Sequence, residues 1–92
     1  MSKNAWKHET YNGWSNWYTW NIAMWFQNDY NVSLWIQEYV EDRQSEGKSL
    51  NYDGLLEYMG VEKGTETPDG VALWSQYVSR PEMRQMLAEY SW

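Results

Sequence analysis

The sequence predicts an all-α domain, a compact bundle of four to five short helices around a central tryptophan-rich helix. Apolar residues recur at intervals of three and four positions, and capping or helix-ending residues flank several of these segments. No segment offers a convincing partner strand to another. A chain of 92 residues has room for one core. We expect residues 13–92 to form the domain and residues 1–12 to be a flexible N-terminal arm.

The first expected helix begins after Ser15 or Asn16, either of which can act as N-cap, and runs to about residue 28. Six of the eight tryptophans lie within the first 35 residues, several of them in this segment. Apolar residues surround almost the whole helical wheel, which indicates burial on most sides. We assign three of its rings to the scaffold: Trp17, Trp20 and Trp25. Trp14 and Trp6 lie outside the helix and are left as candidate contact residues.

The second expected helix is capped by Asn31 and ends near Gly47, a suitable residue for the position after a helix. Its apolar residues share one face at helical spacing: Val32, Trp35, Ile36, Tyr39 and Val40. Its acidic residues line the other side, which we expect to face solvent. This is the cleanest amphipathic segment of the chain.

A short third helix is expected from Ser49 or Asn51 to Gly60, although Gly54 lowers its helical propensity. Residues 60–70 are expected to be a loop with a turn at residues 68–70. The segment Val71–Val78 suits either a strand or one to two helical turns, and we favour a short helix.

The last expected helix begins at the sequence Ser79-Arg-Pro-Glu82, which resembles a capping box with proline in the first turn. Its apolar residues follow at helical spacing: Met83, Met86, Leu87 and Tyr90.

The acidity of the chain is concentrated in its middle. The formal net charge is −6, and residues 29–69 carry ten acidic residues against Arg43, Lys48 and Lys63. Direct nucleic-acid binding is disfavoured because phosphate contacts need a basic stripe. An acidic face can instead attract a basic partner protein. The alternative is an acidic surface that only aids solubility.

The sequence gives no sign of an enzyme, a metal site or a cofactor. There is no cysteine, and the only histidine, His8, falls in the expected arm. The acid pairs Glu38 with Asp42 and Asp53 with Glu57 have helical spacing, but such pairs are common on solvated helices. No segment approaches the length of a membrane span. We therefore expect a cytoplasmic protein without catalytic activity.

The run Asn12-Gly-Trp-Ser-Asn16, followed by Thr19-Trp-Asn21 and Trp25, resembles an N-terminal signature of small uncharacterised proteins encoded by bacteriophages and some bacteria. Their pattern reads N-G-W-S/T-N-Y-E-T-W, so Trp17-Tyr18 replaces a Tyr-Glu pair here. A weaker similarity covers residues 67–71. The resemblance implies a phage origin, and by analogy a role in binding and inhibiting a host protein.

We therefore expect an acidic interaction protein that binds a host protein and modulates it, with a partner that has a basic or nucleic-acid-binding surface. The candidate partner-binding residues are Glu38, Glu41, Asp42, Glu46, Trp14 and Trp6. Two alternatives stay open. One is a structural module that forms a homodimer, and the other is a small-ligand-binding domain that uses the tryptophan cluster.

Overall fold

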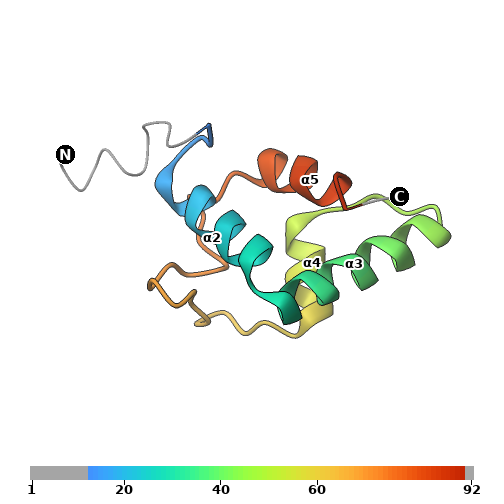
Figure 1. Cartoon of the computed structure of the whole chain (residues 1–92), viewed down its shortest axis with the longest axis horizontal. Coiled ribbons are helices and arrows are strands. Elements are labelled where there is room, and N and C mark those ends of the chain that lie inside the picture. The colour runs from blue at the N-terminus through green and yellow to red at the C-terminus, as the bar shows by residue number, and fades with distance from the viewer. Residues whose placement is uncertain (1–12, 91–92) are drawn as a thin grey trace.

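The computed structural model describes residues 13–90, in which four α-helices follow one another (Figure 1). They are α2 (Trp17–Asn28), α3 (Tyr30–Ser45), α4 (Tyr52–Met59) and α5 (Arg80–Ala88). Within this range no strand forms, and one isolated antiparallel bridge joins Glu66 to Ala72. The predicted all-α class is therefore confirmed. The expected arm, with Trp6 and His8, lies outside the described residues.

Helix α2 begins after Asn16, the second of the two predicted caps. The Asn16 Oδ1 accepts a hydrogen bond from the backbone N–H of Thr19 at 2.8 Å. The residues of α2 that are fully buried in the core are Ile22, Ala23 and Phe26. Trp17 and Trp25 pack against that core as expected, but they are only half-buried at its edge. An indole combines a large apolar ring with an N–H that needs a partner, so it fits the boundary better than the centre.

A single residue, Asp29, separates α2 from α3, and the predicted cap at Asn31 is wrong. The Asp29 backbone N–H donates to the Trp25 carbonyl at 3.0 Å and closes α2. Its side-chain Oδ1 accepts from the Val32 N–H at 3.0 Å and caps α3. Asparagine and aspartate are comparable caps, so the sequence alone does not choose between positions 29 and 31. The two helices are consequently joined without a loop.

Helix α4 begins after Asn51 and ends at Gly60, as predicted, and the structure explains why it contains Gly54. A Cβ atom at Gly54 would lie 2.7 Å from the Tyr39 hydroxyl and 2.9 Å from Asn51 Oδ1. That hydroxyl is fixed, because it donates to the Asn51 carbonyl and accepts from the Asn51 N–H. Glycine therefore allows α4 to approach α3 closely where Tyr39 is buried.

The segment Val71–Val78 is not a helix, and this prediction is wrong. It consists mainly of turns, and its apolar residues Val71, Leu73 and Val78 are buried. Its backbone groups bond to distant partners: the Leu73 N–H donates to the Thr65 carbonyl, and the Tyr52 hydroxyl donates to the Leu73 carbonyl at 2.5 Å. Such tertiary bonds replace the local ladder that a helix would provide.

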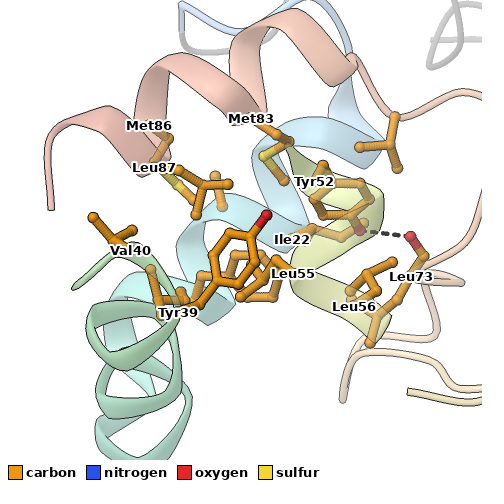
Figure 2. Close-up of a cluster of buried hydrophobic side chains, with 14 of the residues drawn as sticks. Ile22, Tyr39, Val40, Tyr52, Leu55, Leu56, Leu73, Met83, Met86 and Leu87 are labelled. Atoms are coloured by element: carbon orange, nitrogen blue, oxygen red, sulfur yellow. Dashed lines mark hydrogen bonds between the residues drawn. The ribbon is translucent and has the colours of Figure 1, made fainter. Parts of the chain in front are cut away.

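Helix α5 begins after its predicted cap, Ser79, and covers the core in contact with α2, α3 and α4 (Figure 2). Met83, Met86 and Leu87 lie on its buried face and meet residues of α2, α3 and α4. The predicted capping box is only half formed. Ser79 Oγ accepts from the Glu82 N–H at 3.4 Å, whereas the Glu82 carboxylate accepts from the Ser15 N–H at 2.8 Å. Glu82 thus connects α5 to the residues before α2.

Candidate protein-binding surface

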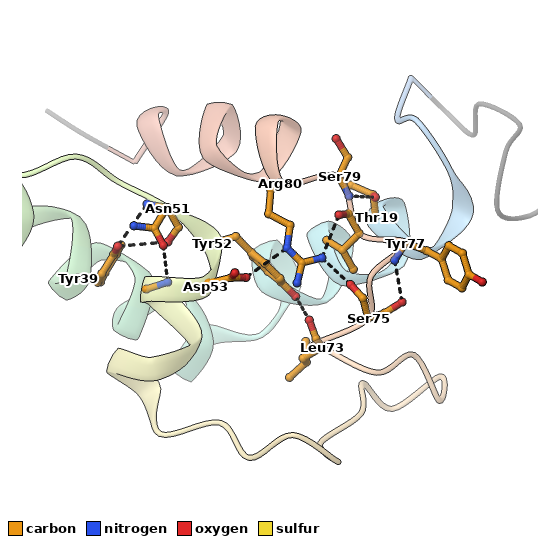
Figure 3. Close-up of polar contacts among 12 residues, drawn as sticks. Thr19, Tyr39, Asn51, Tyr52, Asp53, Leu73, Ser75, Tyr77, Ser79 and Arg80 are labelled. Atoms are coloured by element: carbon orange, nitrogen blue, oxygen red, sulfur yellow. Dashed lines mark hydrogen bonds and ion pairs between the residues drawn. The ribbon is translucent and has the colours of Figure 1, made fainter.

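Three polar residues of the N-terminal signature hold the chain that precedes α5. Asn16 Nδ2 donates to the Tyr77 carbonyl at 2.6 Å. Thr19 Oγ1 accepts from the Ser79 N–H at 2.9 Å (Figure 3). Both side chains are buried. The Tyr18 ring also stacks on Tyr77 with centroids 5.6 Å apart. These contacts give Asn16 and Thr19 a structural role.

The third signature residue, Asn21, reaches the turn around residues 67–70. Asn21 Oδ1 accepts from Thr67 Oγ1 at 2.8 Å, and Asn21 Nδ2 donates to Asp69 Oδ2 at 2.8 Å. Asn21 and Thr67 are buried and satisfy each other's polar groups. The two stretches that carry the sequence resemblance are therefore in contact, and their shared polar residues stabilise the fold.

Trp14 is half-buried and packs against the core, so much of this candidate contact residue covers apolar side chains. It also borders a small hollow of about 180 Å³ together with Gln27 and Gln85. Trp6 lies outside the described residues.

A second polar centre surrounds Arg80 at the start of α5 (Figure 3). Its guanidinium donates to the carbonyls of Ser75 and Val78, pairs with Asp53 at 3.2 Å and lies over the Tyr52 ring. An open hollow of about 640 Å³, with largely apolar walls, lies beside it and includes Arg84. Because Arg80 already bonds to backbone carbonyls and a carboxylate, its main role here is to hold the 75–79 backbone.

All four predicted acidic contact residues are exposed: Glu38, Glu41, Asp42 and Glu46. Glu38 and Glu41 lie on the side of α3 away from its buried residues, whereas Asp42 and Glu46, the C-cap residue of α3, border a hollow between α3 and α4. Glu46 forms an ion pair with Lys48 at 3.3 Å. This pair is weak because water surrounds both side chains. The only basic residue of α3, Arg43, donates to the Ser49 carbonyl instead. The four predicted acidic residues are thus exposed along the second half of α3 and at its C-cap.

Three large apolar side chains of α3 are also exposed and were missed as contact residues. Tyr30, Leu34 and Trp35 are 70%, 45% and 45% exposed. The predicted burial of Trp35 is wrong, because the core-facing stripe of α3 is narrower and passes through Ile36, Tyr39 and Val40. We call these residues and the four acids the outer face of α3.

The Trp35 ring is held in place although it is exposed. It meets the Tyr58 ring of α4 edge-on, with centroids 5.9 Å apart, and Tyr58 meets Tyr39 edge-on at 5.4 Å. Edge-to-face pairs of this kind are favourable beyond the apolar area that they bury. Tyr39, the innermost of these three rings, is buried and hydrogen-bonded to Asn51, which fixes its position. Trp35 is therefore an ordered surface ring.

Asp42 fixes the middle one of these three rings, because its Oδ2 accepts a hydrogen bond from the Tyr58 hydroxyl at 2.6 Å. This bond, helped by desolvation and by the charges of Asp42 and Glu38, raises the pKa of Tyr58 to about 12. Next to it, a hollow of about 510 Å³ opens between α3 and α4. Its walls carry four carboxylates: Asp42, Glu46, Asp53 and Glu57.

Alkaline pH is expected to destabilise the fold through Tyr58 and Tyr52. Burial raises the pKa of Tyr52, as the Asp42 bond raises the pKa of Tyr58 to about 12. Both hydroxyls stay protonated in the folded chain after they ionise in the unfolded one near pH 10. Their stabilising contribution is complete below about pH 10 and is lost as the pH rises through the folded values. Urea unfolding at pH 8 and pH 11 should show this loss, and a Tyr52→Phe, Tyr58→Phe double variant should show a smaller one.

Within residues 13–90, no group of three or more His, Asp or Glu side chains is arranged so that it could hold a metal ion. The acid pairs Glu38 with Asp42 and Asp53 with Glu57 lie on exposed helix surfaces. None of the helices in residues 13–90 has the length and apolar character that a membrane crossing requires.

Comparison with known proteins places the whole domain in one family. A model of a family of unknown function, DUF7249, matches residues 7–92. The chain belongs to this family. No curated protein and no solved structure gives a match. The family match includes the residues of α2 and of the 67–79 segment that bond to each other, and also the outer face of α3.

Proposed function

We propose that the protein is an acidic interaction protein that binds a basic surface of another protein through the outer face of α3. The observation that carries this proposal is the combination of exposed apolar rings on α3 with four exposed carboxylates, three on the helix and the fourth at its C-cap. Apolar anchors supply binding energy, and complementary charge supplies orientation and rate.

The other features of the chain support a binding role more than a catalytic one. The signature residues Asn16, Thr19 and Asn21 are engaged in holding the fold. In contrast, the outer face of α3 carries exposed aromatic rings that are not part of the buried core. A surface of this kind is a typical protein contact site.

We further propose that the partner is a host protein, with the phage-type role that the signature suggests. The acidic character favours a partner whose own surface is basic, such as one that binds nucleic acid. Binding there would compete with the nucleic acid for the same basic surface. The expected consequence is inhibition of the partner.

The test compares two charge-reversal variants of a tagged protein in capture experiments from the host. One variant carries Glu38→Lys, Glu41→Lys and Glu46→Lys, and the control carries Glu62→Lys, Glu66→Lys and Glu89→Lys. All six residues are exposed, and each variant changes the net charge equally. Asp42 is spared because it holds Tyr58.

We expect the α3 variant to lose the captured protein and the control variant to retain it, with capture by the unaltered protein weakening as salt rises. Equal capture by the two variants would contradict the proposal. Circular dichroism spectra of both variants verify that each remains helical.

A homodimer is the second candidate, because the same apolar residues could be covered by another copy of the chain. Light scattering at high micromolar concentration separates the two candidates. A dimeric mass that becomes monomeric on Trp35→Ala would favour the dimer.

A further inference from the structure

We infer that the outer face of α3 binds one amphipathic helical segment of its partner, with an apolar half against Tyr30, Leu34 and Trp35 and a basic half against the acids. This inference rests on the proposed function and names the class of partner. The two kinds of side chain are separated along α3, since the exposed apolar residues lie at positions 30–35 and the acids at 38–46.

The geometry of α3 favours a helix as the occupant. Helix α3 has 16 residues and thus a length of about 24 Å, so it can pair with four turns of another helix. A peptide that binds by adding a strand would need an exposed sheet edge, and residues 13–90 form no strand. Side chains at intervals of three and four on α3 present the ridges and grooves that a second helix packs into.

The charges along this face determine which part of the bound helix carries basic side chains. Four carboxylates lie on the second half of the face, and Arg43 is turned to the Ser49 carbonyl. The hollow of about 510 Å³ between α3 and α4 adds the carboxylates of Asp53 and Glu57 beside them. Lysine or arginine side chains on the half of the bound helix that lies over these carboxylates therefore meet acceptors, whereas acidic ones are repelled.

Trp35 is the expected anchor because its ring is ordered before binding. The contacts Trp35–Tyr58 and Tyr58–Asp42 fix it at the surface, which reduces the entropy lost when a partner covers it. Tyr58 acts through Trp35 and is thus a positioning residue. The Tyr58 hydroxyl is hydrogen-bonded to Asp42 within the protein. Removal of this hydroxyl therefore loosens the Trp35 ring without removing an apolar contact to the partner.

The probe is a labelled synthetic peptide of about 16 residues, with leucines on one helical face of its first half and lysines on the same face of its second half. A scrambled peptide of equal composition and a peptide with glutamate in place of lysine are the comparisons. Fluorescence anisotropy with the purified full chain gives each affinity. We expect the ordered peptide to bind at least about tenfold more tightly than either comparison.

Protein variants localise the binding. Trp35→Ala is expected to weaken it at least about tenfold, and Glu38→Gln to weaken it by a few fold, whereas Glu89→Gln at the C-cap of α5 leaves it unchanged. Tyr58→Phe should weaken binding and also shift and broaden the Trp35 indole N–H resonance in the free protein. An effect on affinity without that spectral change would refute the positioning role.

Equal binding of the ordered and scrambled peptides would overturn the inference, as would unchanged affinity on Trp35→Ala. A dimer through Trp35 that the peptide does not dissociate would also overturn it. These results are distinguishable from failure of the proposed function. If the proposed function is wrong, the α3 charge-reversal variant still captures its partner, whatever the peptides show.

Discussion

Replacement of Asn16 by alanine is expected to lower the free energy of unfolding by about 2–3 kcal/mol. Two interactions are lost together. The cap on α2 disappears because Asn16 Oδ1 no longer accepts from the Thr19 N–H, and the Tyr77 carbonyl loses the donor at 2.6 Å. Asn16 is 6% exposed, so water replaces these bonds poorly. Urea unfolding with linear extrapolation measures the change.

Two further variants separate these contributions. Ser15→Ala alters the neighbouring candidate cap, which is exposed, and is expected to change stability by less than about 0.5 kcal/mol. Asn16→Asp keeps an acceptor for the Thr19 N–H but places a carboxylate oxygen against the Tyr77 carbonyl. It should therefore still be destabilised, by about 1–2 kcal/mol. A stable Asn16→Asp variant would show that the bond to Tyr77 contributes nothing.

The helices were predictable because local signals agree with the tertiary structure. Asn16, Asn51 and Ser79 cap their helices, and Gly60 ends one with a positive φ of 73°. At residues 29–31 two comparable caps compete, and the choice depends on how closely α2 and α3 pack. The segment 71–78 could not be predicted, because its conformation depends on side chains from Asn16, Tyr52 and Arg80.

The candidate surface was predictable in its charges but not in its apolar residues. A carboxylate on an amphipathic helix faces solvent with few exceptions, so Glu38, Glu41 and Asp42 were placed correctly. Trp35 has the same helical spacing as the buried Ile36 and Tyr39, and only the narrow contact between α3 and its neighbours exposes it. One signal was present: Tyr30, Leu34 and Trp35 together make the apolar set of α3 wider than a single buried stripe requires.

The roles of the aromatic residues lead to a paired prediction on Phe26 and Trp35. Phe26 is completely buried and lies 5.6 Å and 6.2 Å from the Trp25 and Tyr52 ring centroids. Phe26→Ala should destabilise by about 3–5 kcal/mol, because it removes buried apolar area and leaves a cavity. Trp35→Ala removes a larger ring but should cost less than about 1.5 kcal/mol, mainly its edge contact with Tyr58.

Thermal and urea unfolding of both variants, with Trp74→Phe as a tryptophan control, measure the contrast. Trp74 is half-buried and its Nε1 donates to the Val61 carbonyl at 2.9 Å, so its loss should have an intermediate effect. A Trp35→Ala variant as unstable as Phe26→Ala would mean that Trp35 belongs to the core. A stable Trp35→Ala variant would show that the exposed Trp35 ring contributes little to the stability of the fold. That result is expected of a residue whose role is binding.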